Sequence, residues 1–354
     1  MGISIILLAR KEATNLIKLL PMIKSIMNKI DEDYEIIVVD ANPSLDNTKE
    51  VCKKNKVTYI NQTNKGYANA FNSGVEISKY GKIVFLDCDF SHDPNSIIDI
   101  NNKFNKGYDL IIGSRYIKGG KTLDSKTSRV LSKILGFIYR ICLGLKVHDV
   151  STSFRMYNAK QLKAVTLEST NFEVLEEVIF KMMQNKPKFK IGEVPITFNQ
   201  RLFGTSNRRL LAFVFTYLKS LYNLIIIRYK SNDSFRNVVL YILIGLSAAI
   251  VDLLTFIMLY KVMMLGGIIS NIISMHVGLL FSFIFNSSIN FKKTNKIALR
   301  FSLYYVVIMC GIIVSTYIVY LFNNYAILGK LISLIIVPLC QFLLNRKLAF
   351  RYMK

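Results

Sequence analysis

The chain has 354 residues and combines a formal net charge of +23 with 52% hydrophobic residues. Nucleic acid as a partner would explain the charge but not the hydrophobicity, whereas an anionic membrane surface explains both, so we expect a lipid bilayer and no nucleic acid. The five cysteines are scattered and in no ligand spacing, which argues against a disulfide framework or a zinc site and suits a reducing cytosol.

Apolar stretches alternate with helical patterns over residues 1–207, which predicts an α/β domain with a Rossmann-like, mostly parallel sheet. The expected strands are residues 3–8, 35–40, 57–60, 83–86 and 109–112, and the expected helices are residues 13–30, a helix capped by Asp46, residues 69–78 and a helix near 95–105. The chain begins with a buried strand that runs into a helix, not with a signal peptide, so this domain is expected in the cytoplasm.

Polar side chains follow four of these strands. Glu12 comes just past the first strand, Asp40 ends the second, Asp87 and Asp89 follow the fourth, and Arg115 follows the fifth. Ligands of open α/β sheets bind at the carboxyl ends of the strands, so these four strand ends predict one nucleotide pocket.

The stretch 83–94, IVFLDCDFSHDP, reads as a buried strand that ends in two carboxylates. The period of a strand places Asp87 and Asp89 on the same side of the backbone, where they would repel each other unless a cation lay between them. A divalent ion that holds a diphosphate suits this arrangement. For the tripeptide alone, a solvated strand-to-loop turn is an equally open interpretation.

The last third of the chain is typical of a membrane domain. Residues 208–229 are apolar on most sides but are interrupted by Lys219 and Asn223, which favours interfacial helices over residues 208–236 rather than a span. Residues 237–354 then contain four apolar stretches, each of about the 20 residues that a bilayer needs. The expected all-α four-helix transmembrane domain has its spans at about 238–260, 262–285, 301–322 and 326–344.

Basic residues lie before the first of these spans, after the second and after the fourth. This distribution predicts a multi-pass protein of the cell membrane whose α/β domain and both termini are cytoplasmic. Asp252 and His276 would lie at membrane depth, where a functional role and a polar contact between helices are both open. Asn286 and Asn345 each stand five residues before a Phe and a basic residue, a weak repeat that predicts two helical hairpins of common origin.

Four motifs together resemble family 2 glycosyltransferases. They are Asp87–Asp89, Gly113–Gly120 (GSRYIKGG), His148–Arg155 (HDVSTSFR) and Glu193–Asn207 (EVPITFNQRLFGTSN). Residues 1 to about 230 resemble polyprenyl-phosphate sugar synthases of the dolichyl-phosphate mannose synthase type, and the four spans resemble the GtrA-like domain fused behind some prokaryotic members.

The resemblance implies a GT-A fold and an inverting, metal-dependent transfer of a hexose to a polyprenyl or dolichyl monophosphate at the cytoplasmic membrane face. GDP-mannose is the first choice of donor, and UDP-glucose with undecaprenyl phosphate is the second. A lipid-linked sugar translocase whose soluble domain binds a nucleotide sugar is the alternative from another class, and an oligomer is possible.

The resemblance also implies the site residues. Asp87 and Asp89, with the hydroxyl of Ser91, would hold Mg²⁺ or Mn²⁺ against the diphosphate. The implied catalytic residues are Asp89, Arg115, Arg129, Asp149, Glu177 and Arg201, in which the three arginines bind the lipid phosphate and the departing diphosphate, Asp149 lies near the sugar and Glu177 faces the acceptor. The implied nucleotide-binding residues are Leu8, Arg10, Glu12, Val39, Asp40, Asp87, Cys88, Asp89, Arg115, Arg201 and Asn207.

Some positions depart from the family pattern or stay open. The stretch 8–12 lacks the family's Pro and aromatic residue, Ala41 stands in place of a second Asp and Asn207 in place of a Lys, so the base of the donor is left open. Ser91 stands in place of a Gln, which leaves the third metal ligand open. Asp40 is expected to bind the base or ribose, with capping of the next helix as the alternative. His92 and His148 are expected in solvated loops, because nothing in the sequence pairs either of them with a nucleophile.

Overall fold

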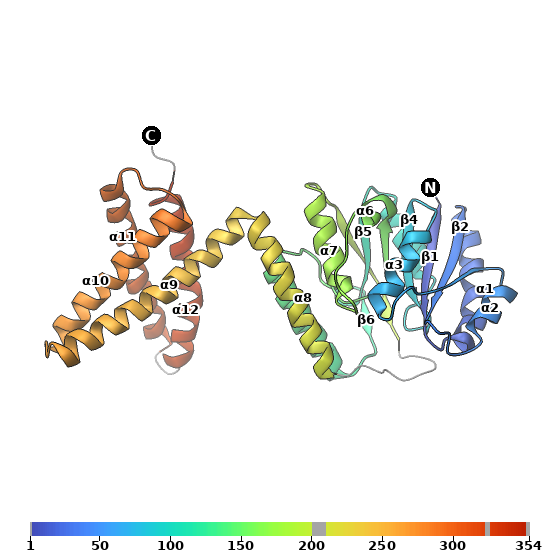
Figure 1. Ribbon diagram of the computed structural model, residues 1–354, viewed down its shortest axis with the longest axis horizontal. Coiled ribbons are helices and arrows are strands. Elements are labelled where there is room, and N and C mark those ends of the chain that lie inside the picture. The colour runs from blue at the N-terminus through green and yellow to red at the C-terminus, as the bar shows by residue number, and fades with distance from the viewer. Residues whose placement is uncertain (1, 200–209, 323–325, 352–354) are drawn as a thin grey trace. The chain divides into compact units, whose positions relative to one another are not determined.

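The computed structural model describes residues 2–199, 210–322 and 326–351 (Figure 1). The chain divides into two compact units, Met1–Ile227 and Arg228–Lys354, and the boundary falls inside helix α8 (Leu210–Ser231). The first unit is α/β and the second is helical. The fold class predicted from the sequence is therefore confirmed.

A seven-stranded sheet with the order β3-β2-β1-β4-β7-β5-β8 forms the centre of the first unit. Its strands are β1 (Ile3–Ala9), β2 (Tyr34–Asp40), β3 (Thr58–Asn61), β4 (Lys82–Asp87), β5 (Leu110–Ser114), β7 (Arg155–Asn158) and β8 (Ile191–Pro195). All neighbours are parallel except β7, which pairs antiparallel with both β4 and β5. The short strands β6 (Lys121–Thr122) and β9 (Thr197–Phe198) form a separate parallel pair.

Helices cover both faces of the sheet (Figure 1). They are α1 (Ala13–Ile30), α2 (Thr48–Lys54), α3 (Tyr67–Ile77), α4 (Ser96–Phe104), α5 (Lys126–Leu143), α6 (Ala159–Lys163) and α7 (Val174–Asn185). Because side chains alternate along a strand, Ile5 packs with α1 and α4 while Ile6 packs with α3 and α7. The two cores fix the register of β1 and hence the level at which its neighbours end.

Helix α5 was not predicted, although its apolar residues have helical spacing. Gly136, Tyr139 and Leu143 are buried, and the Tyr139 hydroxyl donates a hydrogen bond to the carbonyl of Tyr217 in α8 at 2.9 Å. Leu135 and Cys142 are half-buried against the same core, whereas six other apolar residues of the helix are exposed: Val130, Leu131, Ile134, Phe137, Ile138 and Ile141. The helix therefore turns an apolar face away from the core of its unit.

The second unit consists of α9 (Asp233–Ile257), α10 (Gly267–Phe285), α11 (Ile297–Leu321) and α12 (Ala326–Lys347), with the π-helical segments η1 (Met258–Val262) and η2 (Asn286–Asn290). Helix α9 packs against α10, and α11 packs against α12, so the unit contains two helical hairpins. Among the described residues, three segments are long and apolar enough to cross a membrane: Asp233–Val262, Ile272–Asn290 and Ile297–Val314. Helix α12 coincides with the fourth predicted span.

The two asparagines of the predicted repeat are fully buried. The Asn345 amide donates to the Tyr241 hydroxyl at 3.0 Å, and the Asn286 amide donates to the carbonyl of Ser282 at 2.9 Å. His276 lies 3.3 Å from the Tyr305 hydroxyl, which is the polar contact between helices that the sequence left open. Asn345 thus ties α12 to α9, whereas the Asn286 bond stays within its own helical segment.

Candidate active site

The two carboxylates of the DxD motif lie at the end of β4, where Asp87 pairs with Leu8 of β1. Asp89 is buried and accepts a hydrogen bond from the backbone N–H of Ser91 at 3.0 Å, whereas the Asp87 side chain is 33% exposed. The Ser91 hydroxyl is buried and has no hydrogen-bond partner in the described part of the chain. Two carboxylates and an orphaned hydroxyl fit a hard divalent cation, which prefers oxygen ligands.

The described residues contain no group of three His, Cys, Asp or Glu side chains that could hold a metal. An ion at Asp87 and Asp89 would therefore need further oxygens from Ser91, from water or from a bound diphosphate. Ions such as Mg²⁺ commonly keep this arrangement, with one or two carboxylates and substrate phosphates as ligands.

The expectation that His92 lies in a solvated loop is wrong. The imidazole is 1% exposed and lies between the rings of Phe154 and Phe198, at 5.2 and 5.1 Å between centroids. Burial lowers its pKa, although Asp87, whose carboxylate is 3.6 Å away, acts in the opposite direction. The loop is buried because Phe198 pairs with it from β9, more than a hundred residues later, a contact that the sequence does not reveal.

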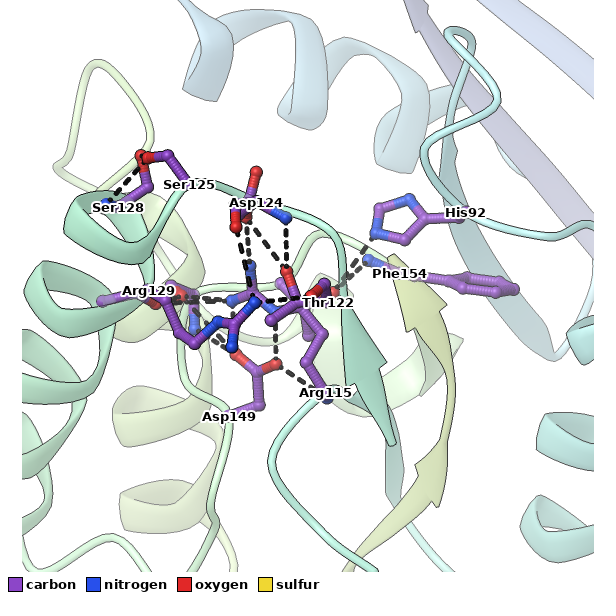
Figure 2. Close-up of polar contacts among 12 residues, drawn as sticks. His92, Arg115, Thr122, Asp124, Ser125, Ser128, Arg129, Asp149 and Phe154 are labelled. Carbon is purple, nitrogen blue, oxygen red and sulfur yellow. Dashed lines mark hydrogen bonds and ion pairs between the residues drawn. The ribbon is translucent and has the colours of Figure 1, made fainter. Parts of the chain in front are cut away.

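Arg115 follows β5 and forms a buried pair with Asp149 (Figure 2). Its Nε donates to Asp149 Oδ2 at 2.7 Å, its Nη2 donates to Oδ1 at 2.8 Å, and its backbone N–H donates to Oδ2 at 3.1 Å. Burial alone would raise the pKa of Asp149, but the hydrogen bonds and charge of Arg115 outweigh it and lower the pKa. The Asp149 carboxylate is thus engaged in holding the arginine.

Arg129, in the first turn of α5, lies beside this pair (Figure 2). Its Nη2 donates to the carbonyl oxygen of Thr122 at 2.9 Å and to that of Asp124 at 3.5 Å. Asp124 also lies near the other arginine, with Oδ2 at 3.8 Å from Arg115 Nη1. Two of the three predicted arginines therefore meet at residues 121–124, whereas Arg201 and Asn207 lie outside the described residues.

Asp40 and Glu12 lie at the same edge of the sheet and accept hydrogen bonds from nearby side chains. Asp40 is fully buried and accepts hydrogen bonds from the Ser44 hydroxyl at 2.5 Å and the Tyr59 hydroxyl at 3.1 Å. Glu12 accepts a hydrogen bond from the side chain of Asn15 at 2.6 Å. These contacts shape the loops at the predicted base pocket, and Asp40 does not cap the helix that follows it.

Asp46 provides the cap instead. Its Oδ1 accepts the N–H of Thr48 at the start of α2, at 3.1 Å, and its Oδ2 accepts the N–H of Ala13 at the start of α1, at 3.0 Å. One carboxylate thus satisfies the first turns of two helices. The predicted cap of α2 is confirmed, and the bond to α1 is a long-range addition.

The other predicted nucleotide-binding residues differ in exposure. Arg10 is exposed and Leu8 is half-buried, so both can face a ligand. The side chains of Val39 and Cys88 are buried in the two cores, and the Cys88 thiol donates to the carbonyl of Leu8 at 3.4 Å. A nucleotide would reach only the backbone of these two residues.

Glu177 supports a loop. It is buried, accepts the N–H groups of Glu168 and Ser169 at 2.8 and 2.9 Å, and pairs with Lys181 at 2.7 Å. Burial acts to raise the pKa of Glu177, but Lys181 and the two amides outweigh it and lower the pKa. The contacts of this carboxylate therefore position residues 168–169, a role that the sequence did not suggest.

Asp124 is the site residue that the sequence analysis did not single out. A signal was present, because Asp124 is the only acidic residue in the stretch 115–133, which contains six Lys and Arg residues. An isolated carboxylate in so basic a stretch indicates a specific partner.

Comparison with known proteins gives two family matches. Residues 4–166 match glycosyl transferase family 2, and residues 240–350 match the GtrA/DPMS transmembrane domain. Together with the α/β unit and its acidic strand end, the first match defines a glycosyltransferase. The chain belongs to glycosyl transferase family 2, as its resemblance predicted, and the second match and the apolar helices indicate a membrane protein.

The chain is similar to several curated enzymes. It is 27% identical to the dolichol-phosphate mannosyltransferase of Pyrococcus furiosus over 360 residues, which cover 98% of each protein. It is 31% identical over 207 residues to the undecaprenyl-phosphate mannosyltransferase of Micrococcus luteus, covering 54% of this chain and 83% of that one. The glucosyl-3-phosphoglycerate synthase of Mycobacterium tuberculosis, solved with Mn²⁺ and UDP, aligns with 63% of this chain and 80% of its own at 16% identity and a TM-score of 0.49.

Proposed function

We propose that this glycosyltransferase moves a hexose, with mannose from GDP-mannose as the first choice, to a polyprenyl or dolichyl monophosphate at the cytoplasmic face of the membrane. The observation that carries the proposal is the surface of α5. This one helix holds Arg129 beside Arg115 and exposes six apolar side chains over the following turns. A phosphate site next to an exposed apolar face suits an acceptor with a charged head and a hydrocarbon tail.

The similar enzymes support the same acceptor class, because they are a dolichol-phosphate mannosyltransferase and an undecaprenyl-phosphate mannosyltransferase. UDP-glucose with undecaprenyl phosphate remains the second donor and acceptor pair. The basic residues that flank the membrane helices support a multi-pass topology with both termini in the cytoplasm.

Asp87 and Asp89, with the Ser91 hydroxyl, would hold Mg²⁺ or Mn²⁺. When bound there, such an ion supplies positive charge that neutralises the departing diphosphate. Arg115 and Arg129 would bind phosphate oxygens through guanidinium N–H groups, which match the geometry of a phosphate.

The acceptor needs little activation. A phosphate monoester is mostly ionised at pH 7, because its second pKa is about 6. An acceptor oxygen forms a bond to the anomeric carbon of the sugar while the bond from that carbon to the diphosphate breaks, and this single displacement inverts the configuration. The described residues accordingly work by binding and orienting two anionic substrates, with proximity on the membrane as a further aid.

A lipid-linked sugar translocase is the second candidate, and one feature of the helical unit favours it. Asp252 lines a pocket of about 200 Å³ together with Gly278, Ser282 and Tyr304. A carboxylate at membrane depth is a functional candidate by default. On this hypothesis the first unit would bind nucleotide sugar without transferring it.

The test is transfer of label from a panel of radioactive nucleotide sugars into chloroform-extractable lipid, using membranes that contain the full chain. We expect one sugar to label lipid, and we expect Asp89→Ala to abolish this labelling. Asp99→Ala is the matched control, because Asp99 is an exposed carboxylate on α4. Undiminished transfer by Asp89→Ala would refute the metal assignment, and absence of labelled lipid with every sugar would favour the translocase.

A further inference from the structure

We propose that Asp124 is an internal substitute for a phosphate group. Its carboxylate occupies the guanidinium edge of Arg115 that an acceptor phosphate would bind, and it thereby sets the affinity of the site for that phosphate. The nature of the acceptor rests on the proposed function. The competition itself rests on the contacts of residues 121–124, which we call the strap.

One edge of the Arg115 guanidinium is not bonded to Asp149. Nε and Nη2 of its guanidinium are committed to Asp149, and Nη2 also donates to the Ser151 hydroxyl at 2.8 Å. The remaining nitrogen, Nη1, has Asp124 Oδ2 at 3.8 Å (Figure 2). Within the described part of the chain, Nη1 is thus the nitrogen whose partner is an anion other than Asp149.

The two carboxylates that face Arg115 differ in exposure to solvent. The side chain of Asp149 is fully buried, that of Arg115 is 8% exposed, and that of Asp124 is 35% exposed. The contact between Asp124 and Arg115 is also long for an ion pair. A partly exposed ion pair of this length is weak, because solvent screens it and two side chains must be ordered. An incoming anion can therefore replace Asp124 but not Asp149.

Backbone hydrogen bonds hold the strap in place. Its backbone bonds to β9 and to the residue before it: Lys121 N–H donates to the carbonyl of Ile196 and Leu123 N–H to the carbonyl of Phe198, both at 2.9 Å. Arg129 donates to the carbonyl of Thr122 at 2.9 Å. These bonds do not involve the Asp124 carboxylate, whose Oδ2 accepts a hydrogen bond from the Thr122 hydroxyl at 3.3 Å within the strap. The side chain can therefore leave Arg115 at the loss of this one local bond while the strap stays in place.

A phosphate carries more negative charge than the Asp124 carboxylate. A phosphate monoester carries a charge of about −1.5 to −2 at pH 7, against −1 for a carboxylate, and it has three acceptor oxygens. It therefore competes well with Asp124 for Nη1, and Arg129, which bonds to the same strap, offers a second guanidinium for another oxygen. Without the acceptor, Asp124 supplies the anion that the partly buried guanidinium edge would otherwise lack.

The experiment measures binding of farnesyl phosphate, a short isoprenyl monophosphate, to the full chain in detergent by isothermal titration calorimetry. Asp124→Asn is expected to tighten binding by roughly two- to fivefold, the range that corresponds to one partly exposed ion pair. Asp124→Glu keeps the charge and is expected to bind like the unmodified protein. Asp99→Asn removes an equal charge from an exposed site and is expected to change nothing.

Unchanged or weaker binding by a folded Asp124→Asn protein would overturn the proposal. A parallel titration with GDP and UDP separates the two phosphate sources. Tightening for the nucleotides alone would place the leaving diphosphate at Nη1 and refute the assignment to the acceptor. Because no turnover is needed, these outcomes are independent of whether any nucleotide sugar labels lipid in the transfer assay.

Discussion

The pair formed by Arg115 and Asp149 allows a quantitative prediction for Asp149→Asn. The substitution removes a carboxylate that accepts hydrogen bonds at 2.7 and 2.8 Å from a guanidinium, with the two side chains 8% and 0% exposed. Breaking one side of a buried pair costs about 3–5 kcal/mol, because the other charge is left without compensation. Asparagine keeps one acceptor oxygen, so we expect the low end, about 3 kcal/mol. For a unit of this size that loss lowers the melting temperature by about 6–12 °C.

The assay is thermal unfolding of the full chain in detergent, followed by circular dichroism, with Asp99→Asn as the exposed control. Arg115→Met, added to Asp149→Asn, tests the cause of the loss. Removing the stranded charge should restore part of the stability, since replacement of both partners of a buried pair is far less costly than replacement of one. A decrease of less than about 2 °C in the single variant, or a further decrease in the double variant, would refute the reasoning.

The same pair predicts a dependence on pH. The pKa of Asp149 in the folded chain lies below its ordinary value of 3.8, because Arg115 outweighs the effect of burial. Near and below the ordinary value the unfolded chain takes up a proton that the folded chain does not, so the contribution of Asp149 to stability is complete above about pH 5 and is lost as the pH falls through and below that value. The difference in melting temperature between the unmodified chain and Asp149→Asn should shrink between pH 5 and 3. A constant difference would contradict this assignment.

Three further substitutions test single contacts. Asp46→Ala should cost about 1–2 kcal/mol in urea unfolding, because Asp46 caps α1 and α2, whereas Asp46→Asn should lose less. Glu177→Ala should speed amide hydrogen exchange at residues 168–169, whose N–H groups the carboxylate accepts; unaltered exchange would argue against a loop-holding role. Arg300→Met should make the end of α12 more sensitive to protease than Lys347→Ala does, because buried Arg300 donates to the carbonyls of Ala349 and Arg351.

The sequence predicted the elements whose evidence is local. Apolar runs and helical spacing placed five of the six parallel strands, all but β8, and the membrane helices, because burial of one face leaves a periodic pattern. Strand β7 was missed because it is short and begins with Arg155, a charge that interrupts the apolar run. This arginine is fully buried and donates to the carbonyls of Leu175 and Val150, both at 2.5 Å. Those acceptors lie elsewhere in the chain, so no local pattern reveals that the charge is satisfied.

Helix α5 is a different case, because its spacing was visible and its partner was not. The apolar residues of 126–143 recur at helical intervals, but the sequence does not tell which of them enter the core. In the structure Tyr139 points into the core, whereas Phe137 is 56% exposed. Hydrophobic periodicity normally indicates a buried face, and here most of it indicates an apolar surface that suits a membrane.

The candidate site was predicted as a set of residue types, but its charge distribution depends on pairing. Three arginines suggested three cationic groups for phosphate, yet Asp149 neutralises Arg115 in a buried pair. In the described part of the chain, Arg129 donates to the carbonyl oxygens of Thr122 and Asp124, which carry no net charge, so Arg129 keeps its positive charge. In the proposed reaction Arg129 therefore provides most of the electrostatic attraction for the acceptor, and Arg115 provides a fixed geometry. It follows that Arg129→Gln should weaken phosphate binding, and the dependence of that binding on salt, more than Arg115→Gln does. The affinities are compared for variants that are folded to the same extent.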